Sequence, residues 1–363
     1  MNKNKYLKGV GLFLLAMVLT LSGCGTGEGT SKEPNEQVEE NIDSDVLVGT
    51  VNGITKYQDT VYDRKTVEGK LAFYFMSSGN DLPTWLNNTQ GGDSILIITP
   101  DGKTALVDCG HQAEGAAIVT KLQKLGIDKL DYLIISHGHT DHAGGFSIIA
   151  RYIEIGQVLM PPVEAMDRSD YVGVDLMYQI EELNIPYKYL TEGETFTIGE
   201  DVQVKNFNPP AGFAEDKNIN LNESSLVLKF TYGESSFLLN GDIGNNEAYG
   251  QKTEEVLVAK WGSELQADIS KVGHHGSDKA KSSDVWKETV DSKIYVFTTP
   301  YVRDEIEHFK HVKTGALTLT TALDGDILIY TSGDGTYDVQ VSGDRTTNYY
   351  GTIDTKDGHM LVE

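Results

Sequence analysis

Residues 137–142 read HGHTDH and follow the run Leu133-Ile134-Ile135-Ser136, which predicts a buried strand. Four side chains of metal-ligand type lie in this stretch: His137, His139, Asp141 and His142. Two histidines one residue apart can bind one ion, and the Asp-His pair that follows can turn toward a second. Two adjacent ions make a hydrolytic site, in which one generates hydroxide and both stabilise the attacked centre. Three of the nine histidines of the chain lie here, which argues against an incidental polar loop.

Further polar side chains follow other strand-like runs. Asp108, Asp242 and the pair His274-His275 each come directly after an apolar segment. In sheet-based hydrolases, ligands converge where the strands end. A single Asp after a strand is usually a turn or helix-cap residue. Because Asp108 and Asp242 follow strand-like runs in the same way as the histidine cluster does, one shared metal site is favoured.

Together these motifs resemble the metallo-β-lactamase fold superfamily, and more closely the hydrolase domain of the competence protein ComEC. The pieces that carry the resemblance are QGGDSILI at 90–97, LVDCG at 106–110, SHGHTDHAGG at 136–145, NESSLVL at 222–228, NGD at 240–242 and HHGS at 274–277. The resemblance covers about residues 70–335 and implies a four-layer αββα sandwich. The alternation of strand-like and helix-like segments predicts only an α/β fold by itself. Its helix-like segments include residues 115–125, 245–258 and 314–323.

The combined hypothesis is a site for two divalent metal ions, with Zn²⁺ preferred. His137 and His139 are expected to hold the first ion. Asp141, His142 and one histidine of the pair at 274–275, preferably His274, are expected to hold the second. Asp242 is expected to bridge the two ions.

Other residues are expected to support this site. Asp108 is expected to orient a ligand histidine or the attacking water, and Asp141 to help deprotonate that water. His275 and Asp93 are candidates for contact with the substrate or with the ligands.

No histidine lies between residues 142 and 242, where the superfamily has a third single ligand. The ComEC-like group shares this lack. Asn222 or Ser225 is the expected substitute. The resulting oxygen-rich set of ligands makes Mn²⁺ a competitor of Zn²⁺.

The resemblance also implies a histidine after the tyrosine at position 301. His308 or His311 is expected to protonate the leaving group or to hold a phosphate oxygen; a surface histidine is the alternative. The subfamily resemblance favours a phosphodiester substrate, as in nucleases or phosphorylcholine esterases of teichoic acid. A lactone or amide hydrolase of the same fold and a non-catalytic extracellular binding module are the alternatives.

Residues 1–23 predict a lipoprotein signal peptide, with lysines at the start and an apolar stretch from about residue 10 to 21. LSGC at 21–24 resembles a lipobox, so Cys24 is expected to carry the lipid that anchors the protein to the outer face of the bacterial cytoplasmic membrane. A plain secretory signal is the alternative. Residues 24–45 predict an acidic disordered tether, and residues 46–363 a single hydrolase domain.

The sequence has 30 basic and 54 acidic residues, which gives a formal net charge of −24. Binding to nucleic acid without sequence preference relies on lysine and arginine to neutralise phosphates. The charge therefore favours a small or wall-polymer phosphodiester over long duplex DNA. The sequence indicates no protein partner. Because no second apolar stretch has spanning length, the chain is not expected to be a DNA transporter itself.

Overall fold

A computed structural model of the chain describes residues 61–77, 92–162, 172–213, 220–246, 251–277, 281–300 and 316–343, with short strand segments at 56–57, 353–354 and 359–360. Contacts divide the chain into residues 1–42 and 43–363, and all described residues belong to the second unit. The predictions for Cys24, the tether, His308 and His311 lie outside the described residues and stay predictions. Within the described residues, no helix is long and apolar enough to cross a membrane.

Two mixed sheets form the centre of the second unit. The strands of the first sheet, in their spatial order, are Lys56–Tyr57 (β1), Asp338–Val341 (β18), Ile327–Thr331 (β17), Leu71–Phe75 (β2), Ile95–Ile98 (β3), Thr104–Val107 (β4), Lys129–Ile134 (β5), Glu154–Met160 (β6) and Tyr187–Tyr189 (β7). The strands of the second sheet are Leu317–Thr320 (β16), Ile294–Phe297 (β15), Ile269–Lys271 (β14), Ser235–Leu239 (β11), Leu228–Tyr232 (β10), Val202–Asn206 (β9) and Thr195–Ile198 (β8). In each sheet one half is parallel: β4 to β7 in the first, and β11, β14, β15 and β16 in the second.

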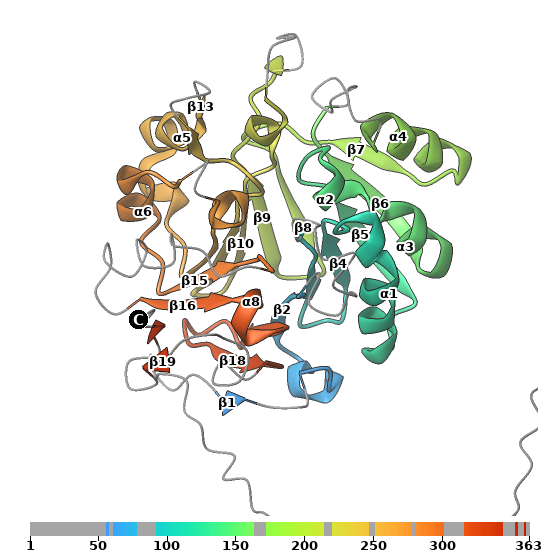
Figure 1. Ribbon diagram of the computed structural model, residues 1–363, viewed down its shortest axis with the longest axis horizontal. Coiled ribbons are helices and arrows are strands. Elements are labelled where there is room, and N and C mark those ends of the chain that lie inside the picture. The colour runs from blue at the N-terminus through green and yellow to red at the C-terminus, as the bar shows by residue number, and fades with distance from the viewer. Residues whose placement is uncertain are drawn as a thin grey trace, which may run out of the picture. The chain divides into compact units, whose positions relative to one another are not determined.

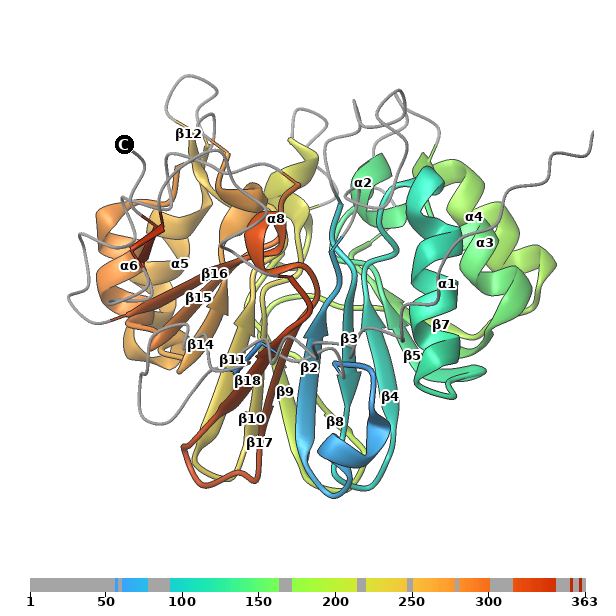
Figure 2. The same cartoon turned by 60° about the horizontal axis from the view of Figure 1, so that its bottom comes forward.

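The helices cover the outer faces of the two sheets. The described helices are Gly115–Lys124 (α1), Thr140–Ala143 (α2), Phe146–Tyr152 (α3), Val172–Glu182 (α4), Thr253–Trp261 (α5), Asp284–Val290 (α6) and Thr321–Asp324 (α8). Two small antiparallel pairs complete the list, Asn245–Asn246 (β12) with Gln251–Lys252 (β13) and Ile353–Asp354 (β19) with His359–Met360 (β20). Figure 1 shows how these elements follow one another, and Figure 2 shows α1, α3 and α4 along one side of the strands and α5 and α6 along the other.

The buried side chains separate into three clusters that match these layers. On β2, Leu71, Phe73 and Phe75 face the second sheet, while Ala72 and Tyr74 face the helices. This alternation follows from the two-residue period of a strand. Between the sheets, the ring of Phe73 stacks on that of Phe237 with centroids 3.8 Å apart. The predicted α/β fold with four αββα layers is confirmed.

Two predicted helices, over 245–258 and 314–323, agree with the structure only in their C-terminal parts, which belong to α5 and α8. Residues 245–258 hold the short strands β12 and β13, and the helix begins only at Thr253, where Glu254 and Glu255 occupy its first turn. Residues 317–320 form β16, because the alternating Leu-Thr-Leu-Thr pattern suits a strand that pairs in parallel with β15. The helix predicted over 115–125 is present as α1, and Gly126 follows it with a φ of 68°.

Candidate metal centre

The ligand candidates lie where parallel strands of both sheets end. Asp108 follows β4, and the HGHTDH stretch begins two residues after its neighbour β5, while Asp242 and His274-His275 follow the neighbouring strands β11 and β14. The two sheets pack face to face, so these loops meet at one end of the sandwich. A backbone hydrogen bond of 2.9 Å from the Leu226 amide to the Ser136 carbonyl links the two halves.

Asp108 is fixed behind His142. Its Oδ1 accepts a hydrogen bond of 2.6 Å from the Ser136 amide, and its Oδ2 lies 2.8 Å from Nδ1 of His142. The backbone of Asp108 has a φ of 62°, in the left-handed region that Asp tolerates better than most residues. This turn brings the carboxylate back to the next strand. Nδ1 of His142 is therefore held, and its Nε2 is left for the centre of the site.

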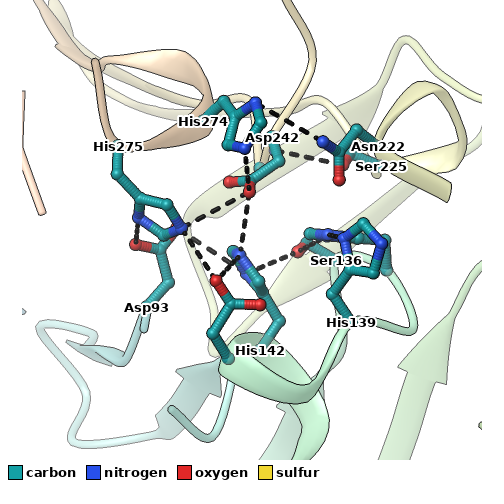
Figure 3. A network of polar contacts seen from close by, with 12 residues as sticks. Asp93, Ser136, His139, His142, Asn222, Ser225, Asp242, His274 and His275 are labelled. Atoms are coloured by element: carbon teal, nitrogen blue, oxygen red, sulfur yellow. Dashed lines mark hydrogen bonds and ion pairs between the residues drawn. The ribbon is translucent and has the colours of Figure 1, made fainter. Parts of the chain in front are cut away.

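The rings of His142 and His275 converge on the carboxylate of Asp242 (Figure 3). Nε2 of His142 lies 3.2 Å and Nε2 of His275 lies 3.4 Å from Oδ2 of Asp242. Nε2 of His275 also lies 3.3 Å from Oδ2 of Asp141. Among the described residues, both Nε2 atoms and Oδ1 of Asp242 are buried and make no hydrogen bond of regular geometry. Buried polar atoms that face one another without hydrogen bonds fit a cation between them.

A second group of nitrogen donors consists of His137, His139 and His274. Nε2 of His137 and Nδ1 of His139 are 3.0 Å apart, so both can reach one ion. Nε2 of His274 lies 4.0 Å from Oδ2 of Asp242. Burial lowers the pKa of His137 well below its usual value, and the neighbouring His142 lowers it further. His137 is therefore neutral, which is the form of histidine that binds a metal ion.

The histidine pair divides between the two groups because of its backbone. His274 and His275 have φ angles of 44° and 55°, both in the left-handed region. Such consecutive strained residues cost free energy and are typical of functional sites. His275 points at Asp141 and Asp242 while the Thr298 carbonyl, 2.9 Å away, holds its Nδ1. The preference for His274 as the ligand of the second ion stays a prediction, and this geometry favours His275 there.

Asn222 and Ser225, the predicted substitutes for the third histidine, contact His274 and the Asp242 loop. Nδ2 of Asn222 lies 3.4 Å from Nδ1 of His274, and Oγ of Ser225 accepts a 3.0 Å hydrogen bond from the Asp242 amide. Ser225 therefore supports the loop of Asp242. Asn222 is positioned against His274, and among the described residues its buried Oδ1 has no hydrogen-bond partner.

The family model of the metallo-beta-lactamase superfamily matches residues 88–285, more than half of the chain and all of the ligand loops described above. The chain belongs to the metallo-beta-lactamase superfamily. This superfamily consists of metal-dependent hydrolases that use divalent ions, and the Asp and His residues described here form a site of the required chemistry. Its metal ligands and their roles in this chain remain predictions.

Among curated relatives, the competence protein ComA of Neisseria gonorrhoeae is 29% identical over 211 residues, which are 58% of this chain and 26% of the relative. ComE operon protein 3 of Bacillus subtilis is 28% identical over 160 residues, 44% of this chain and 19% of the relative. These two relatives are ComEC-like, so the expected resemblance is confirmed. The chain spans about a quarter of their length or less.

A further relative and a solved structure are less similar to this chain in sequence. Exodeoxyribonuclease YycJ of Bacillus anthracis is 24% identical over 189 residues, 50% of this chain and 68% of the relative. The crystal structure of the metallo-beta-lactamase fold protein YhfI from Bacillus subtilis aligns with a TM-score of 0.44 and 12% identity, over 72% of this chain and 99% of that one.

Two further buried residues belong to this metallo-beta-lactamase site: Asp93, which the sequence predicted as a candidate for contact with the substrate or with the ligands, and Lys271, which the sequence did not identify. Asp93, of the QGGD turn, is 1% exposed and belongs with His142, Asp242 and His275 to one group whose ligand atoms lie within 4.8 Å of one another. Lys271, the last residue of β14, is also 1% exposed and lies 2.8 Å from Oδ2 of Asp93. Lys271 lies in the apolar run before the histidine pair, and this position in the sequence does not predict an ion pair with Asp93.

Neighbouring histidines keep two carboxylates of the site, Asp242 and Asp141, in the ionised form. Burial alone would raise the pKa of Asp242, but His142 and His275 lower it well below its usual value. Burial would also raise the pKa of Asp141, yet the same two histidines lower it to about 2. Burial would lower the pKa of His142 and of His275, but Asp242 and other nearby carboxylates raise it well above its usual value. A bound cation would take the place of these protons, and the set of carboxylates and histidines matches the ligands that divalent ions such as Zn²⁺ or Mn²⁺ bind.

Proposed function

We propose that the chain is a metal-dependent phosphodiesterase with two metal ions. The observation that carries this proposal is the meeting of two donor groups at Asp242. His137, His139 and His274 would hold the first ion, Asp141, His142 and His275 the second, and Asp242 would bridge them. His274 would thereby take the place of the missing third histidine.

The chain's own residues have distinct tasks in this proposal. The ions would supply an activated water near neutral pH and would stabilise negative charge on the attacked phosphorus. Asp108 would keep Nε2 of His142 directed at the second ion through its contact with Nδ1. Asp141, whose side chain is 17% exposed, would accept a proton from the attacking water. His308 stays the candidate for protonating the leaving group.

A phosphodiester is the preferred substrate because one relative carries the name of an exodeoxyribonuclease, which cleaves such bonds in DNA. The formal charge of −24 opposes long nucleic acids and supports a small or wall-polymer phosphodiester. We further propose that a lipid on Cys24 anchors the enzyme outside the cell. A substrate there would include the phosphodiesters of the cell envelope.

A panel of substrates tests the proposal. The full-length chain is loaded with Zn²⁺ or Mn²⁺ and assayed with bis-p-nitrophenyl phosphate, a lactone and a β-lactam. Turnover of the phosphodiester, lost in Asp242→Ala, supports the proposal. Turnover of the lactone or β-lactam alone would replace it with the alternative hydrolase. Two bound ions with no turnover on any substrate would favour the binding module.

A further inference from the structure

Lys271 places a buried ammonium group beside the candidate metal ligands. It ends β14, three residues before the histidine pair, and is 1% exposed. Burial would lower its pKa, but Asp93 and Asp242 raise it, so the group is charged. A buried lysine is costly unless its charge is paired and its hydrogen bonds are made. The surroundings of Lys271 meet both conditions.

The ammonium donates hydrogen bonds to two backbone carbonyls and forms an ion pair with Asp93, whose carboxylate oxygens make no hydrogen bond of regular geometry among the described residues. Nζ of Lys271 lies 2.8 Å from the Gly241 carbonyl, 3.0 Å from the Val272 carbonyl and 2.8 Å from Oδ2 of Asp93. The first acceptor directly precedes Asp242, and the second begins the turn of the histidine pair. The Gly241 carbonyl also accepts a 3.3 Å hydrogen bond from the His274 amide. One ammonium therefore joins the two ligand loops of the second sheet.

Asp93 connects this ammonium to the ligand loops of the first sheet. Its amide donates a 3.1 Å hydrogen bond to the Asp141 carbonyl, and its own carbonyl accepts one of 2.8 Å from the Gly110 amide. Its Oδ1 lies 3.2 Å from Nδ1 of His275. The preceding Gly92 packs so closely that a Cβ there would lie 2.0 Å from the Asp141 carbonyl oxygen. The Asp93 carboxylate thus spans the gap between the two halves of the site.

We propose that Lys271 and Asp93 are a pair of positioning residues that hold the metal ligands in place before any ion binds. The inference rests on the proposed metal centre. It assigns the carboxylate of Asp93 to the ammonium and to the ring of His275, rather than to a metal ion. The pair binds no substrate; it fixes the Asp242 loop, the histidine turn and the Asp141 loop relative to one another.

Charge balance supports this assignment. Asp93, Asp108, Asp141 and Asp242 bring four carboxylates into the site, three of them almost fully buried. The positive charge of Lys271 compensates the negative charge of Asp93. The other three carboxylates are then left to interact with His142 and the metal ions. Without the ammonium, Asp93 would be a buried carboxylate with a lost partner and would be drawn toward the cations.

The test compares four variants of the full-length chain: Lys271→Met, Asp93→Asn, the double variant and Lys121→Met. Lys121 is the matched control, because it is a buried lysine whose Nζ lies 2.7 Å from Asp326 Oδ1, outside the site. Thermal unfolding of the metal-free proteins gives a double-mutant cycle for Lys271 and Asp93. Metal content and competition with a chelating dye give the number of ions and their affinity.

The expected results separate positioning from ligation and from simple stabilisation. Lys271→Met should weaken Zn²⁺ binding at least tenfold, Asp93→Asn should keep two ions per chain, and the two losses of thermal stability should be strongly non-additive. Lys121→Met should unfold at lower temperature with unchanged Zn²⁺ affinity.

Three results would overturn the proposed role of the pair. They are additive losses of thermal stability in the double-mutant cycle, an unchanged Zn²⁺ affinity in Lys271→Met, or one bound ion fewer in Asp93→Asn. If Lys271→Met does not fold, Asp93→Asn and the double variant still test the proposal. The double variant should then fold better than Lys271→Met, because it no longer leaves the Asp93 carboxylate without its partner. A parent chain that binds no metal would refute the proposed function. The double-mutant cycle on the metal-free proteins would still test whether Lys271 and Asp93 interact.

Discussion

Nε2 of His142 lies 3.2 Å from Oδ2 of Asp242, although the two residues belong to loops of different sheets. His142 follows β5 of the first sheet, and Asp242 follows β11 of the second. The site therefore exists only when both sheets are packed against each other. Folding of the sandwich and formation of the site are expected to be one event, with Asp242 at the point of contact.

Asp108→Asn should weaken metal binding without preventing folding. The carboxylate holds Nδ1 of His142, and loss of such an orienting contact typically costs 10- to 100-fold in metal affinity. The measurement is Zn²⁺ affinity by dye competition. The control is Asp268→Asn, because Asp268 accepts hydrogen bonds from the amide and hydroxyl of Ser236, as Asp108 does from Ser136, but lies outside the site. Equal affinities in the two variants would contradict the orienting role.

His137→Ala and His275→Ala should each lose one ion and keep the other. In the proposed centre, His137 belongs to the first group of donors and His275 to the second, so each removal affects one metal position. Metal content per chain, measured after dialysis against a weak chelator, checks this. His111→Ala is the control, because His111 caps the 3-10 turn before α1 and contacts the Ala113 amide. Two ions retained in His275→Ala would return the ligand role to His274.

Glu254→Gln should change how stability depends on pH. Burial raises the pKa of Glu254 to about 8, well above its usual 4.5. The folded state therefore binds an extra proton between these values, so this contribution to stability is full below pH 4.5 and is lost as pH rises through 8. Relative to the parent chain, the variant should gain about 3 kcal/mol of unfolding free energy between pH 5 and pH 9.

Urea denaturation at several pH values measures this difference. The exposed Glu264 gives the control variant Glu264→Gln. If the curves for the parent chain and Glu254→Gln run parallel from pH 5 to pH 9, the buried carboxyl does not titrate as described.

Gly273→Ala should disturb the histidine turn. A Cβ on Gly273 would lie 2.1 Å from the Ile243 carbonyl oxygen, so the turn must shift away from the Asp242 loop. We expect a folded but less stable protein that binds fewer ions. Gly69→Ala, where a Cβ would meet no atom within 4 Å, should cost about 1 kcal/mol of stability for its positive φ and leave metal content unchanged. Full metal content in Gly273→Ala would show that the close approach is not required.

The sequence predicts the site better than it predicts the elements that carry it. The HGHTDH stretch, Asp108 and Asp242 could be placed at strand ends because each follows an apolar run, and the structure brings them together. The choice between His274 and His275 could not be predicted, because it depends on two left-handed backbone angles. Lys271 gave no signal, because its burial depends on a carboxylate from a distant loop. The strand at 317–320 was read as a helix, because its pairing with β15 is set by tertiary contacts.

The most direct test of the central claim is the number of metal ions per full-length chain together with metal-dependent hydrolysis of bis-p-nitrophenyl phosphate, in the parent and in Asp242→Ala. The account predicts two ions and turnover in the parent, and loss of both turnover and at least one ion in the variant. A parent chain that binds no divalent metal, or an Asp242→Ala variant with full metal content and full turnover, would contradict it.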